Sequence, residues 1–260
     1  MCRKHTFVIL AFGESKYLEV CINSVLNQTD RGEVVIATST PNEYIQNIAD
    51  KHHLSVIVNP DGPKGIGYDF DFAVSVAETP YVTVAHQDDT YEPGFVQKVM
   101  ESVSEDTIIA FTDYHEEHND EVVRENTNLR IKRFLLHPLK KKHWQKSKWM
   151  RRRVLSLGNP ICCPSVTYNR QAIRDNIFES DMKSNIDWLA WERLSRKTGS
   201  FVYVSEDLMM HRVHDEATTN QLIKDNMRTN EDYEMFRKFW PKFMAKILAK
   251  VYSKSEENVK

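Results

Sequence analysis

Short apolar segments alternate with helical segments along the first half of the chain, and this alternation limits the folds that the chain can adopt. Continuous runs of β-branched and apolar residues occupy residues 6–11, 33–38, 54–58, 81–85 and 107–112. Such runs are typical of strands that are buried on both faces. The segments that we expect to be helical lie between them, at residues 17–26, 43–51, 67–78 and 94–103. This order predicts an α/β fold with a mostly parallel sheet flanked by helices.

The size of the chain allows one large domain with an elaborated end. It has 260 residues, of which 41% are hydrophobic, so a sizeable core can form. We expect a main domain over residues 1–220 and a helical extension over residues 221–260. Within the main domain, residues 126–158 are expected to form a basic helical excursion.

The cysteines and the apolar segments bear on the location of the protein. Cys2, Cys21, Cys162 and Cys163 form no C-x-x-C pair, and a reduced intracellular protein is the simplest interpretation. The apolar run at residues 7–12 is too short for a signal peptide or a membrane span. We therefore expect a cytoplasmic protein, or one at the inner face of a membrane.

Two adjacent carboxylates, Asp88 and Asp89, follow the apolar run at residues 81–85. Carboxylates at the end of a buried strand are costly unless a cation meets them. A divalent metal that carries a phosphorylated ligand would satisfy them, because hard cations bind carboxylate oxygens and leave sites for phosphate. The alternative is a polar turn in which one of the two aspartates caps the next helix. Ligands gather at the carboxyl ends of parallel strands, where the turn at residues 38–40 would also lie.

A basic interval follows the predicted sheet. No Asp or Glu occurs from Asn126 to Arg174, and eleven Lys or Arg residues lie between Arg130 and Arg153, among aromatic and aliphatic side chains. Three interpretations stay open: solvated helices, nucleic-acid binding, and contact with an anionic membrane or a phosphate-bearing acceptor. The lysine-rich C-terminal helix has an apolar face, which fits either membrane contact or docking on the main domain.

Four segments carry a resemblance to a known family. They read TFVILAFGES with YLEVCINSVLNQT at residues 6–29, GIGYDFDFAVSVAETPYVTVAHQDDTYEPGF at 65–95, NIDWLAWERL at 185–194 and HRVHDEATT at 211–219. In this order, over about residues 5–220, the chain resembles the family 2 glycosyltransferases of the Rossmann-like GT-A fold. The resemblance implies an enzyme that transfers a sugar from a nucleotide sugar to an acceptor with inversion, commonly with Mn²⁺ or Mg²⁺.

The resemblance also implies roles for single residues. Asp88 and Asp89 match the last two acidic positions of the family's metal motif, and His86 stands where a leading Asp is more usual. Asp89 and His214 would ligate the metal. The residues implied to bind the nucleotide sugar are Ala11, Phe12, Gly13, Glu14, Thr38, Thr40, Asp69, Asp71, His86, Gln87, Asp88 and Arg212.

Asp187 is the candidate catalytic base, because it matches a carboxylate of the family's acidic pair. At the start of a helix, the macrodipole would favour its ionised form, which a base requires. The alternative is that Asp187 only caps this helix while Trp188 packs beneath it. The leaving diphosphate needs positive charge, which a metal on Asp89 and the side chain of Arg212 would supply.

Taken together, these features predict a metal-assisted, inverting glycosyltransferase. The expected donor is a UDP-sugar, and the expected acceptor is a glycan or a lipid-linked acceptor in cell-surface or cell-wall polysaccharide synthesis. Two alternatives remain. One is a nucleotidyltransferase on a related sheet, although residues 12–15 lack its basic, Gly-rich phosphate loop. The other is a non-catalytic nucleic-acid- or membrane-binding protein that uses residues 130–153, and of these two partners we do not expect nucleic acid.

Overall fold

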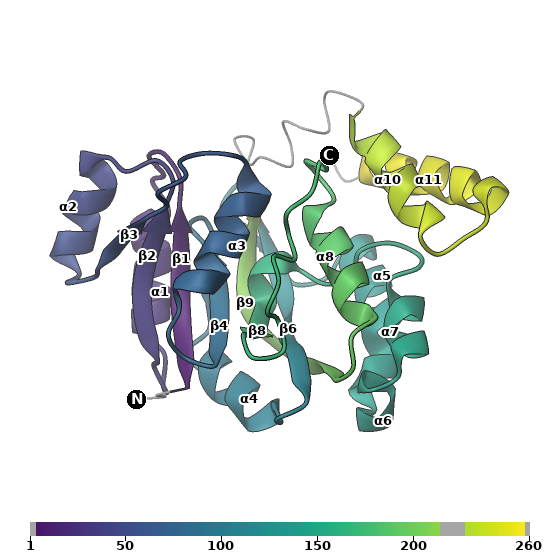
Figure 1. The fold of residues 1–260 in the computed structure, drawn as a ribbon, viewed down its shortest axis with the longest axis horizontal. Coiled ribbons are helices and arrows are strands. Elements are labelled where there is room, and N and C mark those ends of the chain that lie inside the picture. Colours follow the sequence, from purple (N-terminus) through teal and green to yellow (C-terminus); the bar gives the residue numbers. More distant parts are fainter. Residues whose placement is uncertain (1–3, 214–226, 258–260) are drawn as a thin grey trace.

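The computed structural model describes residues 4–213 and 227–257 (Figure 1). The elements of the first half are β1 (His5–Ala11), α1 (Leu18–Leu26), β2 (Glu33–Thr38), α2 (Glu43–Lys51), β3 (Val56–Val58), α3 (Ile66–Val76), β4 (Tyr81–His86), β5 (Thr90–Tyr91), α4 (Phe95–Ser102), β6 (Thr107–His118) and β7 (Glu121–Val123). The remaining elements are α5 (Thr127–Leu136), η1 (His137–Lys140), α6 (Lys142–Gln145), α7 (Lys148–Val154), η2 (Cys163–Ser165), β8 (Val166–Asn169), α8 (Ile186–Ser195), β9 (Ser200–Val213), α10 (Met227–Arg237) and α11 (Lys242–Glu257).

The described strands form one nine-stranded sheet, which confirms the α/β prediction, but this sheet is mixed rather than mostly parallel. The strand order is β3-β2-β1-β4-β8-β6-β9-β5, and β7 pairs with β6. Strands β3, β2, β1 and β4 are parallel neighbours, as are β6 and β9. Strand β8 joins these two groups and is antiparallel to both β4 and β6. At four residues, β8 is too short to give a distinct pattern in the sequence.

Helices cover both faces of the sheet, because neighbouring strand residues point to opposite sides. On β1, Val8 belongs to a core that includes residues of α3, α7, α8, α10 and α11. Its neighbours Phe7 and Ile9 belong to a second core with residues of α1, α2 and α4. The front helices α3 and α8 are visible before the sheet in Figure 1. Burial on both sides explains why β1, β2 and β4 are continuous apolar runs.

Strands β6 and β9 extend well beyond the apolar runs at residues 107–112 and 201–204. They pair in parallel along their length, with a register shift where Asp113 lies opposite Asp207. An irregularity of this kind bends the strand and locally interrupts its pairing. The acidic end of β6 is satisfied by cations from elsewhere, because Arg133 donates to Asp113 at 2.7 Å and Arg212 pairs with Glu117. Because the second halves of β6 and β9 are rich in charged residues, the sequence pattern did not predict that they are strands.

The basic interval is helical, as predicted, but it packs on the sheet instead of forming an excursion. Leu129, Leu139 and Val154 are buried in the two cores. Arg151 is also buried: its guanidinium lies 5.1 Å from the centroid of the Phe201 ring and donates to the carbonyl of Lys197 at 2.7 Å.

The C-terminal helices also pack on the main domain. Met235 and Phe236 of α10 and Ala245 and Ala249 of α11 join the core of α8. The expected domain boundary near residue 220 lies outside the described residues. Within the described ranges, no helix has the length and apolar character that crossing a bilayer requires.

We predict that His5 makes the fold sensitive to acid. Its ring is fully buried beside Phe7 and lies 2.8 Å from the Thr83 hydroxyl, and burial lowers the pKa of His5 from 6.5 to about 3. Below about pH 6.5, His5 therefore binds a proton in the unfolded chain but stays unprotonated in the folded chain. Between pH 7.5 and pH 5, this site alone should remove about 2 kcal/mol of unfolding free energy.

Urea unfolding of the native protein and of His5→Gln at both pH values measures this effect. The variant should lose less stability between the two pH values, because glutamine does not titrate. Equal losses in both proteins would exclude His5 as the source.

Candidate active site

Three loops meet at one edge of the sheet, because β1, β2 and β4 are parallel and end in register. Ala11 lies opposite Thr38, and Leu10 lies opposite His86. The loop after β1 is tied to both neighbours. The Gln87 amide accepts from the Phe12 N–H and donates to the Phe12 carbonyl, each at 3.0 Å. The Gly13 N–H donates to the Thr40 hydroxyl at 2.8 Å. This edge is therefore organised before any ligand binds.

Asp88 and Asp89 point in different directions from this edge. Asp88 accepts a hydrogen bond from the Ser15 hydroxyl at 2.7 Å, which ties it to the loop after β1. Asp89 is buried, and its Oδ1 accepts from the backbone N–H of Arg212 at 2.9 Å and from His211 Nδ1 at 3.0 Å. Asp89 is thus joined to β9, and the helix-capping alternative does not describe it.

The second oxygen of Asp89 is the feature that fits a metal. Oδ2 is buried and has no hydrogen-bond partner among the described residues, and it lies 3.7 Å from Nδ1 of His86. A buried carboxylate oxygen without a donor is costly unless a cation or a ligand group reaches it. Among residues 4–213 and 227–257 there is no cluster of three or more His, Cys, Asp or Glu that could hold a metal alone. The donor would have to supply further ligands, and His214 lies outside the described residues.

The pKa values of the two histidines beside Asp89 are shifted in opposite directions. Burial lowers the pKa of His86, whose ring centroid lies 5.1 Å from that of Phe70 and whose Nε2 has no hydrogen-bond partner within residues 4–213 and 227–257. Burial also acts to lower the pKa of His211, but the charge and hydrogen bond of Asp89 outweigh this effect and raise it. The same contacts outweigh burial at Asp89 and lower the pKa of its carboxyl. These shifts favour the charged forms of Asp89 and His211 and the neutral form of His86.

Arg212 reaches the same edge from β9. Its Nε donates to the carbonyl of Asp88 at 3.1 Å, and its guanidinium lies 4.3 Å from the centroid of the Tyr17 ring and pairs with Glu117. A cavity of about 440 Å³ opens beside it. The cavity is lined by Lys16, Tyr17, Val20, Glu117, Asn119, Asp120, Arg212 and Val213.

Asp69 and Asp71 lie on α3, but only Asp69 faces the edge. Asp69 is buried and accepts from the Ser39 hydroxyl at 2.9 Å and from the Asn59 amide at 3.2 Å. Burial raises the pKa of Asp69, and these two hydrogen bonds oppose the shift. Asp71 instead accepts from the backbone N–H groups of Ile177 at 2.8 Å and Glu179 at 2.9 Å. This contact favours a structural role for Asp71 over the expected contact with the nucleotide.

The other residues predicted to bind the donor differ in how far their side chains are available to a ligand. The Ala11 side chain is buried in the core, and Thr38 is buried with its hydroxyl accepting from the Thr40 N–H at 3.0 Å. Glu14 and Phe12 are exposed, Phe12 to 56%. An exposed ring at a ligand edge is a flat apolar surface on which a planar base can stack.

Asp187 lies in the first turn of α8, as predicted. Its Oδ2 accepts from the Asn159 amide at 2.7 Å, and its Oδ1 accepts from the N–H of Trp188 at 2.7 Å. Asn159 is a site residue that the sequence did not indicate, because it is 28 positions away and belongs to no motif. Helix α10 also holds this region: the Glu231 carboxylate accepts from the N–H groups of Lys183 at 2.7 Å and Ser184 at 2.8 Å, just before α8.

Two partly buried thiols lie within electrostatic range of both Asp89 and Asp187. Burial raises the pKa of Cys162 and of Cys163 well above its ordinary value, and the charges of the two aspartates raise it further. Cys162 and Cys163 are free of disulfides and stay protonated at neutral pH, so nucleophilic catalysis by either thiol is not expected. The metal candidate and the base candidate thus border one region of the molecule.

A comparison with family models identifies the chain. The model described as glycosyl transferase family 2 matches residues 6–178. The chain belongs to glycosyl transferase family 2. This membership confirms the expected enzyme class, a glycosyltransferase, and decides against the nucleotidyltransferase and the non-catalytic binding protein.

Solved structures confirm the GT-A fold of this family 2 glycosyltransferase. TarS 1-349 from S. aureus, in complex with UDP-GlcNAc, is 15% identical with a TM-score of 0.63, and the match covers 95% of this chain and 70% of that one. The mannosyltransferase PcManGT from Pyrobaculum calidifontis, in complex with GDP-Man and Mn²⁺, is 12% identical with a TM-score of 0.63, covering 96% and 69%. No curated protein sequence matches the chain.

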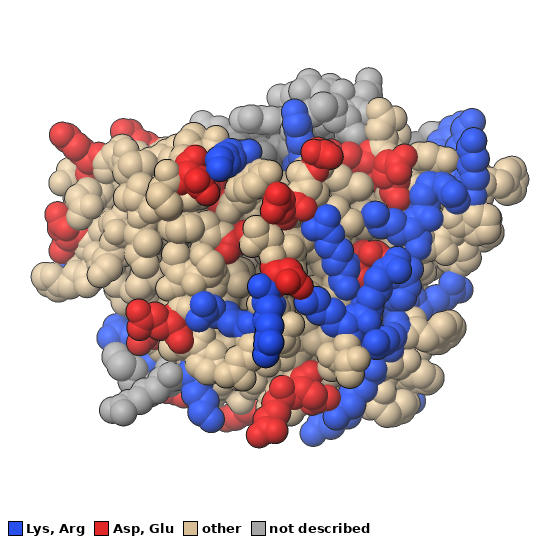
Figure 2. Space-filling view, in the orientation of Figure 1, with Lys and Arg blue, Asp and Glu red and all other residues tan. Residues whose placement is uncertain are grey.

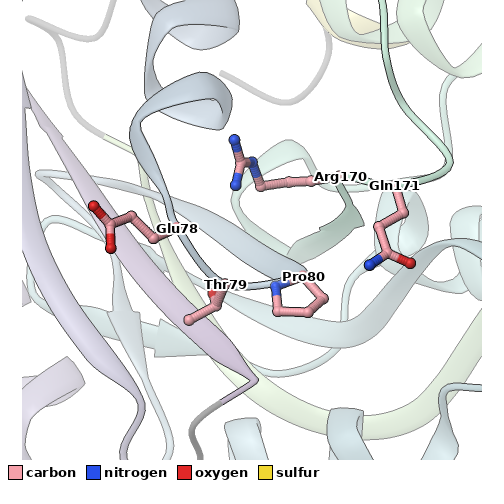
Figure 3. Close-up of a pocket in the computed structure, with 5 residues that line it drawn as sticks. All are labelled: Glu78, Thr79, Pro80, Arg170 and Gln171. Atoms are coloured by element: carbon pink, nitrogen blue, oxygen red, sulfur yellow. The ribbon is translucent and has the colours of Figure 1, made fainter.

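A second cavity of this glycosyltransferase lies away from the edge. It measures about 250 Å³ and is lined by Glu78, Thr79, Pro80, Arg170 and Gln171 (Figure 3). These residues adjoin the beginning of β4 and the end of β8, whereas Asp88 and Asp89 follow the end of β4. This position at the opposite end of the strand separates the cavity from the proposed chemistry.

The two aspartates of α3 give a direct test of the donor side. Asp71→Ala should lower the unfolding free energy by about 1–3 kcal/mol, because it leaves backbone N–H groups of residues 177–179 without an acceptor. UDP affinity measured by calorimetry should stay unchanged. The matched variant Asp69→Ala should weaken UDP binding at least about tenfold. If Asp71→Ala instead weakens UDP binding at unchanged stability, the two assignments must be exchanged.

Proposed function

We propose that this glycosyltransferase transfers a sugar from a UDP-sugar to a glycan or lipid-linked acceptor, with inversion at the transferred carbon. The observation that carries the proposal is the buried Oδ2 of Asp89, which has no hydrogen-bond partner in the described part of the chain, at an edge where three loops are already tied together. Such an edge offers fixed contacts for a nucleotide on one side of Asp88 and Asp89 and for a sugar on the other. Pre-organisation of this kind lowers the cost of binding.

The base and ribose of the donor would lie between the loop after β1 and the N-terminal end of α3. Phe12 offers its exposed ring for stacking. Asp69, held by Ser39 and Asn59, offers carboxylate oxygens that can accept from the N3–H of uracil. UDP is further favoured by the likeness to TarS in complex with UDP-GlcNAc, although the likeness to PcManGT makes GDP the donor nucleotide to compare.

In the transfer step, Asp187 takes the proton of the acceptor hydroxyl while that oxygen attacks the anomeric carbon. The bond between this carbon and the diphosphate oxygen breaks, and UDP leaves with the electron pair. Asn159 and the N–H of Trp188 hold the Asp187 carboxylate in position and stabilise its ionised form. The Arg212 side chain, fixed by Tyr17 and Glu117, offers guanidinium N–H donors near the departing diphosphate.

A divalent cation, Mn²⁺ or Mg²⁺, would be held by Asp89 through Oδ2, and His214 stays a second candidate ligand on sequence grounds. When bound, it would neutralise charge on the diphosphate. The His211 ion pair keeps the Asp89 carboxyl ionised and leaves one oxygen facing the site. The neutral His86 beside it adds no competing charge.

We propose that the enzyme acts in cell-surface or cell-wall polysaccharide synthesis. We expect it in the cytoplasm, at the inner face of the membrane. A lipid-linked acceptor is amphipathic and stays at the bilayer surface, so an enzyme that uses it must approach that surface. The Lys/Arg-rich half of the chain suits such an approach, because anionic lipids attract cations.

The metal assignment is tested by Asp89→Ala and the isosteric Asp89→Asn. Calorimetry of UDP with and without Mn²⁺ should show that Mn²⁺ strengthens binding to the native protein. In both variants this gain should fall at least about tenfold, because the ligand oxygen is lost or neutralised. Asp106→Asn, a carboxylate paired with Lys146 away from the edge, is the matched control. If Mn²⁺ strengthens UDP binding to folded Asp89→Asn as much as to the native protein, Asp89 is not the metal ligand.

The base assignment is tested by Asp187→Asn. Donor affinity should be unchanged, whereas kcat should fall about 10²-fold to 10⁴-fold, because asparagine cannot take the proton. Asn159→Ala should lower kcat less, because the Asp187 carboxylate is still present and can still take the proton. It should shift the pH profile of kcat, because this carboxylate loses a hydrogen bond from Asn159. Near-native turnover in Asp187→Asn would mean that another group is the base.

A further inference from the structure

Helix α11 has one face in the core and one apolar face in solvent. Ala245 and Ala249 are buried against the main domain. Large apolar side chains cover the opposite side, and their exposed fractions are 77% for Phe243, 41% for Met244, 49% for Ile247 and 61% for Val251. Phe243, Ile247 and Val251 recur every four residues, so they form one stripe along the helix. The packing of α11 on the domain therefore does not use this stripe.

A row of lysines borders the stripe. Lys242, Lys246 and Lys250 are exposed and also recur every four residues. None of the three has a carboxylate partner within the described ranges, and no Asp or Glu occurs from residue 235 to residue 255. Figure 2 shows Lys and Arg side chains gathered on the side of the molecule where Figure 1 places α7, α10 and α11. This helix face thus combines apolar side chains with uncompensated positive charge.

Part of the positive charge in the basic interval is already paired with carboxylates of the protein. Arg133 pairs with Asp113, Lys146 with Asp106, and Arg152 with Glu192. A cation that is paired with a carboxylate contributes little attraction to another anion. The lysines of α11 are therefore better placed for an external partner than these three paired cations.

Helix α7 extends the same surface. The Arg153 guanidinium lies 4.9 Å from the centroid of the Trp240 ring, and Trp240 Nε1 donates to the carbonyl of Ser156 at 2.6 Å, just before α11 begins. Trp149 lies four residues before Arg153, on the same side of α7, and its side chain is 65% exposed. An exposed tryptophan next to cations suits the headgroup region of a bilayer.

We propose that α11 binds flat on the surface of an anionic lipid bilayer, with the stripe Phe243, Met244, Ile247 and Val251 inserted among the acyl chains. Lys242, Lys246 and Lys250 then contact the lipid phosphates. Apolar burial and attraction to anionic lipid act together in such helices. The inference deepens the proposed function, since a lipid-linked acceptor lies at this surface. It is tested without donor or acceptor, so the two can fail separately.

The test is cosedimentation of the full chain with vesicles of phosphatidylglycerol and phosphatidylcholine in equal amounts, and with phosphatidylcholine alone. The protein should bind the anionic vesicles and much less of it should bind the neutral ones. Phe243→Ser/Ile247→Ser should weaken binding at least about tenfold, because the inserted apolar area is lost. Lys242→Gln/Lys246→Gln/Lys250→Gln should weaken it by a similar factor. UDP affinity and the melting temperature should stay unchanged in both.

Two matched controls sharpen the result. Val122→Ser removes an apolar side chain that is 55% exposed on β7, away from the lysine row, and should bind as the native protein does. Lys140→Gln/Lys141→Gln/Lys142→Gln removes three exposed cations that lie outside α11 and its apolar stripe, so this variant should have the smaller effect. Full binding by both α11 variants would overturn the proposal. It would also fall if light scattering shows a dimer that the Phe243→Ser/Ile247→Ser variant dissociates, because a second copy would then cover the stripe.

Discussion

The buried carboxylate of Asp89 joins two parts of the sheet that are distant in the chain and in strand order. It follows β4, yet its hydrogen bonds go to His211 and Arg212 on β9, and β8 and β6 lie between these strands. A buried carboxylate must be met by donors or cations, so the chain between β4 and α4 is held at β9. The short β5 completes this crossing by pairing with Met209 and Met210. One Asp89 oxygen accepts both of these hydrogen bonds, and the other is the oxygen that we propose holds the metal.

The same requirement for paired polar groups organises the rest of the edge. Gln87 satisfies both backbone groups of Phe12, and Asn159 satisfies one oxygen of Asp187. Helix α10 contributes through Glu231, whose carboxylate accepts from the backbone just before α8. The C-terminal helices therefore support the base candidate as well as packing on the core. Because these contacts come from the protein itself, the proposed site is positioned by the fold before a donor arrives.

The sequence was informative where a structure depends on short-range pattern. Strands β1, β2 and β4 are buried on both faces, so their apolar runs predict them closely, and Asp88 and Asp89 at the end of β4 predict the edge. The sequence was less informative where the structure depends on contacts with residues that are far away in the chain. The acidic half of β6 looks like a solvated turn until Arg133 and Arg212 are placed beside it. Asp69 and Asp71 are two residues apart, so they point to different sides of α3, and only the packing of residues 177–179 shows which one faces the edge.

The distribution of charge also depends on contacts between residues that are distant in the sequence. The formal net charge of −2 conceals a chain whose first half is acidic, with 22 Asp or Glu against 9 Lys or Arg in residues 1–130, and whose second half is basic, with 15 against 26. Folding removes part of this asymmetry, because Arg133, Arg152 and Lys146 find carboxylates on the main domain. It does not remove the lysines of α11, which face outward next to apolar side chains that a water-facing helix does not need. Since α10 holds the loop before Asp187 while α11 carries this outward face, the two helices connect the proposed catalytic base with the surface at which a lipid-linked acceptor would be held.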